Sequence, residues 1–162
     1  MITKRLALLP ILLLILALLA GCSDSLKPFE YQGLSIDVPT TMTDMGHEGN
    51  YAQFTFALSS ESVAIFGTRS TFEAVEADAS TPLESYAKAV IAANGFRSTP
   101  IDRAGSDYLY FIHLAETDKG DLRYLDAVYK TDNAFWLIQV VAPVTEFNED
   151  TFLGWLDSVT FD

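Results

Sequence analysis

The sequence predicts an α+β domain in which two main helices cover an antiparallel sheet of about six to seven strands. Apolar and polar residues alternate in several segments between residues 31 and 142, which is the period of half-buried strands. Short turn segments separate them, so neighbouring strands are expected to pair as antiparallel hairpins. Only two segments, one in the middle of the chain and one near its end, carry helix signals instead.

The first half of the chain is expected to contain three strands. Residues 31–39 alternate and end at a proline, which predicts one strand. Residues 51–58 alternate again, which predicts a strand with Phe54 and Phe56 on the same face. A serine-rich turn then leads into residues 63–72, so this segment is expected to complete a hairpin.

The first helix is expected over residues 82–94. Thr81 is placed to cap it, and Glu84 is placed to complete a capping box around Pro82. Gly95 supplies a left-handed stop. The apolar residues in between recur at helical spacing, so one side of the helix is expected to lie on the sheet.

A meander of three long strands is expected next. The strand segments are residues 107–116, 122–130 and 134–142, and the segments 117–121 and 131–133 form the turns between them. The third segment is the most apolar run of the domain. It therefore predicts a central strand with both faces covered.

The last helix is expected to begin after Asn148, which is a favourable N-cap residue. Glu149 and Asp150 suit its first turn, because acidic side chains stabilise the positive end of the helix dipole. Phe147 is placed to pack against Phe152 as a hydrophobic staple. The apolar residues that follow are expected to join the core.

The N-terminus predicts export. Lys4 and Arg5 precede an apolar run over residues 6–20, which is shorter than the roughly 20 residues that a membrane-spanning helix needs. Small residues follow the run, as they do before a signal-peptide cleavage site. The expected organisation is a signal peptide over residues 1–21, a short tether over 22–28 and a single domain over 29–162.

The end of this segment, Leu19-Ala20-Gly21-Cys22, resembles the bacterial lipobox. The resemblance implies a bacterial lipoprotein that is cleaved between Gly21 and Cys22 and carries covalent diacylglycerol and fatty acyl groups on Cys22. These chains would anchor the domain to a membrane, and no other cofactor is expected. Ser23 favours the outer membrane, on its periplasmic side, over the inner membrane or a Gram-positive cell membrane. The alternative is a plain signal peptide that happens to contain a cysteine.

Charge and cysteine content exclude several classes of function. The chain has 22 acidic and 10 basic residues and a net charge of −12, which becomes −14 when residues 1–21 are removed. No nucleic-acid partner is expected, because phosphates require a basic face. The acidic domain suits a cationic partner, or the charge serves solubility alone. One cysteine and two histidines cannot supply a closed zinc site.

The candidate site residues are three aromatics and one histidine. Tyr108, Tyr110 and Trp136 lie on adjacent expected strands, where they can line a ligand groove or an interface, or else pack in the core. His113 lies in mid-strand on the face opposite Ile112, and it would need a second group beside it for catalysis; a satisfied strand histidine is the alternative. No motif predicts a nucleophile, a phosphate loop or a metal site, so the chain is expected not to be an enzyme.

Two segments and the order of elements resemble a known family. Residues 31–39, which read Tyr-Gln-Gly-Leu-Ser-Ile-Asp-Val-Pro, and the apolar strand 134–140 are similar to those of PsbP-like domains, and the DcrB-like bacterial lipoproteins are the nearest branch. The resemblance covers roughly residues 29–161 and implies a PsbP-like α/β/α sandwich. It also implies a non-enzymatic accessory or protein-interaction role in a membrane-associated assembly, with an envelope protein as partner. The alternative function is small-ligand binding in an aromatic-lined groove.

Overall fold

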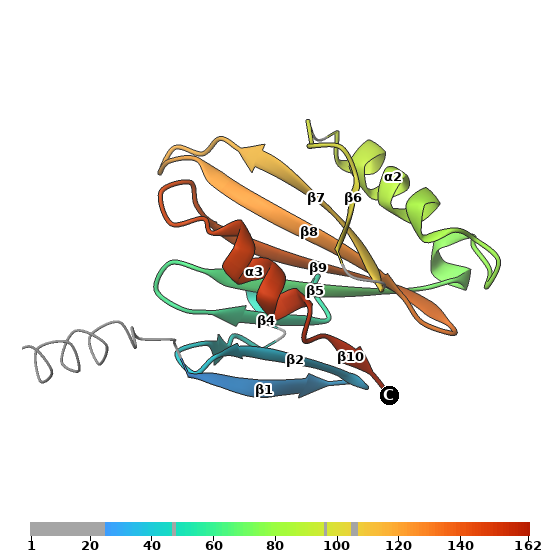
Figure 1. The fold of residues 1–162 in the computed structure, drawn as a ribbon, viewed down its shortest axis with the longest axis horizontal. Coiled ribbons are helices and arrows are strands. Elements are labelled where there is room, and N and C mark those ends of the chain that lie inside the picture. The colour runs from blue at the N-terminus through green and yellow to red at the C-terminus, as the bar shows by residue number, and fades with distance from the viewer. Residues whose placement is uncertain (1–24, 47, 96, 105–106) are drawn as a thin grey trace, which may run out of the picture.

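The computed structural model describes residues 25–46, 48–95, 97–104 and 107–162 (Figure 1). Its helices are α2 (Leu83–Asn94) and α3 (Glu149–Leu156), with the short 3-10 helices η1 (Gly49–Tyr51) and η2 (Glu73–Val75). The strands are β1 (Leu26–Tyr31), β2 (Leu34–Pro39), β3 (Thr43–Asp44), β4 (Phe56–Ser59), β5 (Ala64–Thr71), β6 (Asp102–Ala104), β7 (Tyr108–Ala115), β8 (Leu122–Lys130), β9 (Ala134–Pro143) and β10 (Thr160–Phe161).

The strands form two antiparallel sheets. The larger sheet has seven strands in the order β3-β4-β5-β9-β8-β7-β6, and the smaller has three in the order β1-β2-β10. β9 lies in the middle of the larger sheet, as its apolar composition predicts. β7, β8 and β9 form the expected meander. The predicted α+β class, with a sheet of about six to seven strands and two main helices, is therefore confirmed.

The larger sheet separates two layers (Figure 1). α2 packs on one face, which we call the α2 face, against Leu109, Phe111 and Val128 of β7 and β8. α3 and the smaller sheet cover the opposite face, the α3 face, where Phe152 and Leu156 join the large core cluster. Because side chains alternate along a strand, odd-numbered residues of β7 and β9 lie on the α2 face and even-numbered ones on the α3 face.

The N-terminal segment corrects one expectation. Residues 31–39 are the second half of a hairpin, since β1 pairs with β2 from Leu26 opposite Pro39 to Tyr31 opposite Leu34. β1 escapes the sequence pattern because it is an exposed edge strand that contains Pro28, and prolines are tolerated at sheet edges. Leu26, Lys27 and Pro28, which were expected in the tether, therefore lie in the folded domain.

The expected strand over residues 51–58 is also corrected. β4 begins only at Phe56, after η1 and a turn, so Phe54 precedes the strand. The Phe54 ring stacks on Phe66 of the α2 face, with ring centroids 4.5 Å apart, whereas Phe56 is buried in the core on the α3 face. The hairpin of β4 with β5 forms as expected, with Ser59 opposite Ala64.

The two helix starts differ from each other. The expected capping box of α2 does not form, because Thr81 Oγ1 accepts a bond from the Asp78 amide and Glu84 instead pairs with Lys88 at 2.6 Å. The end of α2 is as expected, since Gly95 has a φ of +65°. At α3, the Asn148 side chain caps the helix by accepting a bond from the Thr151 amide at 3.0 Å.

The described residues pack against one another through two sheets and two core clusters. The staple of Phe147 on Phe152 forms as expected, with ring centroids 5.2 Å apart. Both core clusters and both sheets are completed by residues 26–161, with β10 returning to pair with β2. The described residues between 25 and 162 therefore pack as one unit around these clusters.

Candidate functional site

Three of the four residues singled out from the sequence lie on the α3 face. Tyr108 and Trp136 are buried in the large core cluster, and Tyr110 is half-buried beside it. Their packing is held by hydrogen bonds from Tyr108 to Asp157 at 2.9 Å and from Tyr110 to Glu149 at 3.3 Å. The three aromatics therefore pack the sheet against the α3 layer and do not line a common groove.

Two tyrosine hydroxyls on the α3 face, those of Tyr108 and Tyr129, have a raised pKa. Burial raises the pKa of Tyr108, and the hydrogen bond to the Asp157 carboxylate raises it further. Burial also raises the pKa of Tyr129, whose hydroxyl donates to the Leu156 carbonyl at 2.8 Å. Both tyrosines bond to the last turn of α3, so they hold that helix while they remain protonated.

His113 lies on the opposite side of the sheet, as alternation predicts. Its Nδ1 lies 2.5 Å from Oδ2 of Asp126, which is diagonal to it on β8. The other carboxylate oxygen of Asp126 accepts a bond from Nε2 of Gln139, which stands directly opposite on β9. Because the carboxylate accepts both bonds, the Nδ1 atom of His113 is the donor.

Two residues of this network, His113 and Asp126, are almost completely buried, and Gln139 is half-buried. Asp126 is 0% exposed and His113 is 4% exposed, and the His113 ring stacks on Tyr124 with centroids 4.6 Å apart. A buried carboxylate is costly unless it is paired. Both oxygens of Asp126 are paired here, so the network is a stable polar floor within an otherwise apolar sheet.

A cavity of about 510 Å³ lies above this floor. Gln53 and Phe54 line it from the segment before β4, and Asn94 lines it from the end of α2. Most of its walls are uncharged polar and aromatic side chains. The lining residues are Gln53, Phe54, Phe66, Thr68, Asn94, His113, Ala115, Tyr124, Leu137 and Gln139.

A second cavity of about 380 Å³ lies along α2 and is mainly apolar. Asn94 and Leu137 line both cavities, so the two adjoin, and we call the pair the α2 groove. The lining residues of this second part are Val75, Glu76, Ala77, Thr81, Ser85, Tyr86, Ala89, Val90, Ala93, Asn94, Phe135 and Leu137.

The groove exists because one helix cannot cover the sheet. An α-helix is about 10 Å wide and strands lie about 4.8 Å apart, so α2 covers roughly two strands. It lies mainly over β7 and β8, so β5 and β9 are only partly covered on this face, by the Phe54 ring on Phe66 and the Tyr86 ring on Phe135. Ala89 and Ala93 lie on its flank, and their small side chains leave room beside the helix.

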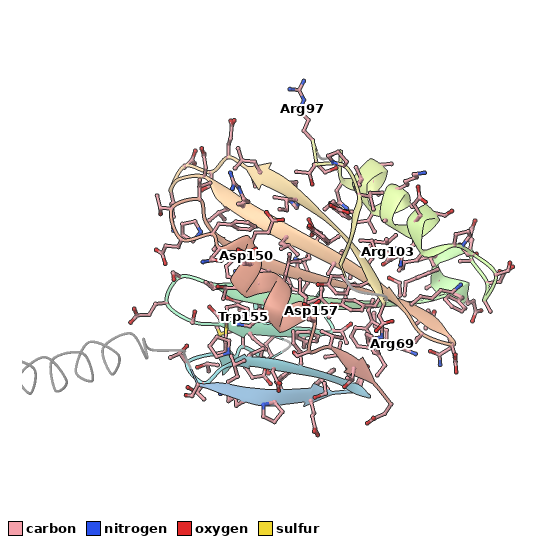
Figure 2. All side chains as sticks on the ribbon, in the orientation of Figure 1. Arg69, Arg97, Arg103, Asp150, Trp155 and Asp157 are labelled. Carbon is pink, nitrogen blue, oxygen red and sulfur yellow. The ribbon has the colours of Figure 1, made fainter. Side chains whose placement is uncertain are left out.

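The electrostatics of the groove are simple. Among the described lining residues, Glu76 is the one carboxylate and no lysine or arginine occurs. Arg69, Arg97 and Arg103 are not among the lining residues, and Figure 2 shows Arg97 pointing away from the domain. The lining residues can therefore make hydrogen bonds and apolar contacts. Lys130 lies beside the Phe135 end, with Nζ 5.8 Å from the Phe135 ring centroid, and it donates to the Thr81 carbonyl.

The sequence reasoning missed Asp126 and Gln139. A signal for them exists, because each is a polar residue inside a long apolar strand, and such residues are buried only when they are paired. The pairing itself depends on strand register, which places Gln139 opposite Asp126. Register is set by the packed sheet and by the turns.

The lipidation and cleavage residues Cys22 and Gly21 lie outside the described residues. Neither α2 nor α3, the helices of the described part, has the length and apolar content of a membrane span. Within the same part, no three His, Cys, Asp or Glu side chains gather into a group able to hold a metal ion.

No protein-family model matches the chain, and no curated protein matches it either. Two solved structures are similar in fold. A crystal structure from Bacteroides thetaiotaomicron VPI-5482 has a TM-score of 0.57 and 10% sequence identity, over 84% of this chain and 48% of that one, so this chain spans about half its length. The solution structure of cyanobacterial PsbP (CyanoP) from Synechocystis sp. PCC 6803 has a TM-score of 0.55 and 10% identity, over 88% of this chain and 96% of that one. The resemblance to PsbP-like domains is thus confirmed at the level of the fold, and the chain has a PsbP-like fold.

Proposed function

We propose that the chain is a lipid-anchored protein of the bacterial envelope that acts by binding, without catalysis, and that it holds a small molecule in the α2 groove. The observation that carries the binding role is the pair of adjoining cavities over β9, together with the satisfied polar network of His113, Asp126 and Gln139 beneath one of them. Ligand sites are commonly concave and mostly apolar, with a few fixed polar groups. An accessory role in a membrane-associated assembly fits such a protein.

The lipid anchor is supported by the lipobox-like residues before Cys22. In the proposed arrangement the acyl chains hold the acidic domain at the membrane, since its charge provides no attraction to anionic head groups. We expect labelled palmitate to be incorporated into the wild-type chain in bacterial cells and not into Cys22→Ala. Equal incorporation in the variant would contradict the anchor.

The binding role is tested with two matched variants of α2. Ala89→Glu places a charged side chain in the groove, whereas Ala92→Glu places the same charge on an exposed residue that lines neither cavity. The full chain is produced in a bacterium, purified and extracted with organic solvent, and the extract is analysed by mass spectrometry. We expect a small molecule in stoichiometric amount from wild type and Ala92→Glu that is lost from Ala89→Glu. The same yield from all three proteins, or none from any, would contradict binding in the groove.

A basic envelope protein is the second candidate partner, and the distribution of carboxylates favours it. The β7–β8 turn and the segment before α3 are joined by a bond from the Val144 amide to the Asp121 carbonyl at 3.1 Å. Exposed acidic residues gather on these two segments, and Figure 2 labels one of them, Asp150. We call this set the acidic end: Glu116, Asp118, Asp121, Glu146, Glu149 and Asp150.

Crosslinking in cells tests this second candidate. A photoreactive residue at Asp118 is expected to give one discrete protein adduct, and the adduct should disappear when Glu146 and Asp150 are changed to Lys, because the attraction is electrostatic. A photoreactive residue at Glu30, on the opposite side of the fold, is the control and should give none. Identical products at Asp118 and Glu30 would contradict a partner at the acidic end.

A further inference from the structure

The α2 groove changes polarity along its length. Phe135, Leu137 and Gln139 are successive residues on the same face of β9, and they line the groove in that order. Side chains two residues apart on a strand are separated by about 6.6 Å, so the floor from Phe135 to Gln139 spans about 13 Å. Phe135 itself is buried beneath the Tyr86 ring, so a molecule at this end would contact Tyr86 and its neighbours, and a molecule of about this length would also reach Gln139.

The end at Phe135 suits a hydrocarbon. Tyr86 stacks on Phe135 with ring centroids 4.4 Å apart, and its hydroxyl is directed to Ser70 on β5 at 3.3 Å. Val75, Ala89 and Ala93 add apolar walls, and Glu76, Thr81 and Ser85 supply the polar groups of this part. The apolar side chains offer van der Waals contact, and burying a methylene there contributes about 0.8 kcal/mol.

The end at Gln139 suits an uncharged polar group. Gln53, Thr68 and Asn94 line it together with Gln139, and amides and hydroxyls both donate and accept hydrogen bonds. No lysine or arginine among the described lining residues could pair with an anion. Both oxygens of Asp126 are already bonded to His113 and Gln139, so the floor has no available carboxylate for a cation.

We propose that the α2 groove binds an uncharged amphipathic molecule, with its hydrocarbon chain at the Phe135 end and a hydroxyl- or amide-bearing head at the Gln139 end. The inference rests on the proposed function, because it names the class of ligand for the same groove. A charged head would lose its hydration at the polar end without gaining a counter-charge, so the charged analogues of such a molecule bind more weakly.

A set of probes with one chain length and different heads tests this. Four compounds are titrated calorimetrically, below the concentrations at which they form micelles, into the segment from Ser23 to Asp162, which contains all the described residues. They are monodecanoylglycerol, decanoate, decyltrimethylammonium and glycerol. Monodecanoylglycerol is expected to bind one molecule per chain. Decanoate and decyltrimethylammonium are expected to bind at least about tenfold more weakly, and glycerol not measurably.

Three variants test where the hydrocarbon chain and the head of the probe bind. Ala89→Glu is expected to abolish binding of monodecanoylglycerol, and Ala92→Glu is expected to leave it unchanged. Thr68→Val removes one hydroxyl at nearly constant shape. It should weaken the binding of monodecanoylglycerol by roughly two- to tenfold, which is the effect of one neutral hydrogen bond, and leave the binding of the uncharged dye Nile red unchanged.

The outcomes separate the two proposals. If decanoate or decyltrimethylammonium binds as tightly as monodecanoylglycerol and Ala89→Glu still blocks both, the groove is a binding site and the class of ligand is wrong. If monodecanoylglycerol does not bind, the inference is overturned, and the co-purified molecule then decides the proposed function alone. If binding is the same in wild type and Ala89→Glu, both proposals fail.

Discussion

Asp126 is the residue on which the floor of the groove depends. It sits between apolar neighbours on β8, and its carboxylate is fully buried. Two bonds, to His113 and Gln139, satisfy it, so the cost of desolvation is offset only while both partners are present. The burial of this carboxylate therefore depends on partners from β7 and β9 as well as on β8 itself.

This dependence gives a measurable coupling between His113 and Asp126. His113→Phe keeps a ring against Tyr124 but leaves the buried carboxylate with one bond, so the free energy of unfolding is expected to fall by about 3–5 kcal/mol. The double variant His113→Phe, Asp126→Leu removes the carboxylate as well and should recover most of that loss. Urea unfolding of the four proteins measures the cycle. If His113→Phe were as stable as wild type, His113 would not be a necessary partner of the buried Asp126 carboxylate.

At the scale of elements, the two helices are held in different ways. α3 has a side-chain cap at Asn148 and is tied to the sheet by Tyr108 and Tyr129, whereas α2 has no side-chain cap and rests on an apolar stripe. Lys130 adds one contact near the start of α2, donating to the carbonyls of Ala79 and Thr81.

The cap of α3 is expected to contribute measurably to stability. Asn148→Ala removes the acceptor for the Thr151 amide, so the free energy of unfolding should fall by about 1 kcal/mol. Asn50→Ala, at an exposed position in η1, is the matched control and should change it by less than about 0.5 kcal/mol. Equal losses in the two variants would argue against the cap.

The tyrosine bonds to α3 predict loss of stability at high pH. Burial raises the pKa of Tyr108 and Tyr129 above the ordinary value, so between that value and the raised one the folded state holds more protons than the unfolded state. The free energy of unfolding is therefore fully retained below about pH 10 and falls as the pH rises above it. Urea unfolding across this range should show a shallower fall in Tyr129→Phe, and Tyr51→Phe is the control. An unchanged slope in Tyr129→Phe would contradict this origin.

At the scale of the whole molecule, the sequence predicts the elements whose signals are local. Alternation and turn residues are enough to predict β7, β8 and β9, and the N-cap residue Asn148 is enough to predict the start of α3. β1 is missed because an exposed edge strand needs no apolar stripe. The capping box expected at the start of α2 is wrong because the Asp78 carboxylate binds Ser80 and Thr81 and so holds Thr81 in a turn. The same bonds lower the pKa of Asp78.

The candidate site is predicted only in part, since it depends on which layer covers which face. Alternation places His113 opposite Tyr108 and Tyr110, and the structure agrees. Tyr108 and Trp136 are buried, and Tyr110 is half-buried, because α3 and the smaller sheet cover that face, which no local pattern reveals. The part of the α2 face beside α2 is only partly covered because one helix is narrower than a seven-stranded sheet. This relation involves elements that are distant in the chain.

The central claim is that ligands bind over β9 beside α2. Amide chemical-shift mapping of the isotope-labelled segment from Ser23 to Asp162, titrated with monodecanoylglycerol, tests it most directly. We predict the largest shifts at Ala89, Ala93 and Leu137, with the β1-β2-β10 sheet unaffected. Shifts concentrated around Tyr110 or on the smaller sheet, or no shifts at all, would contradict it.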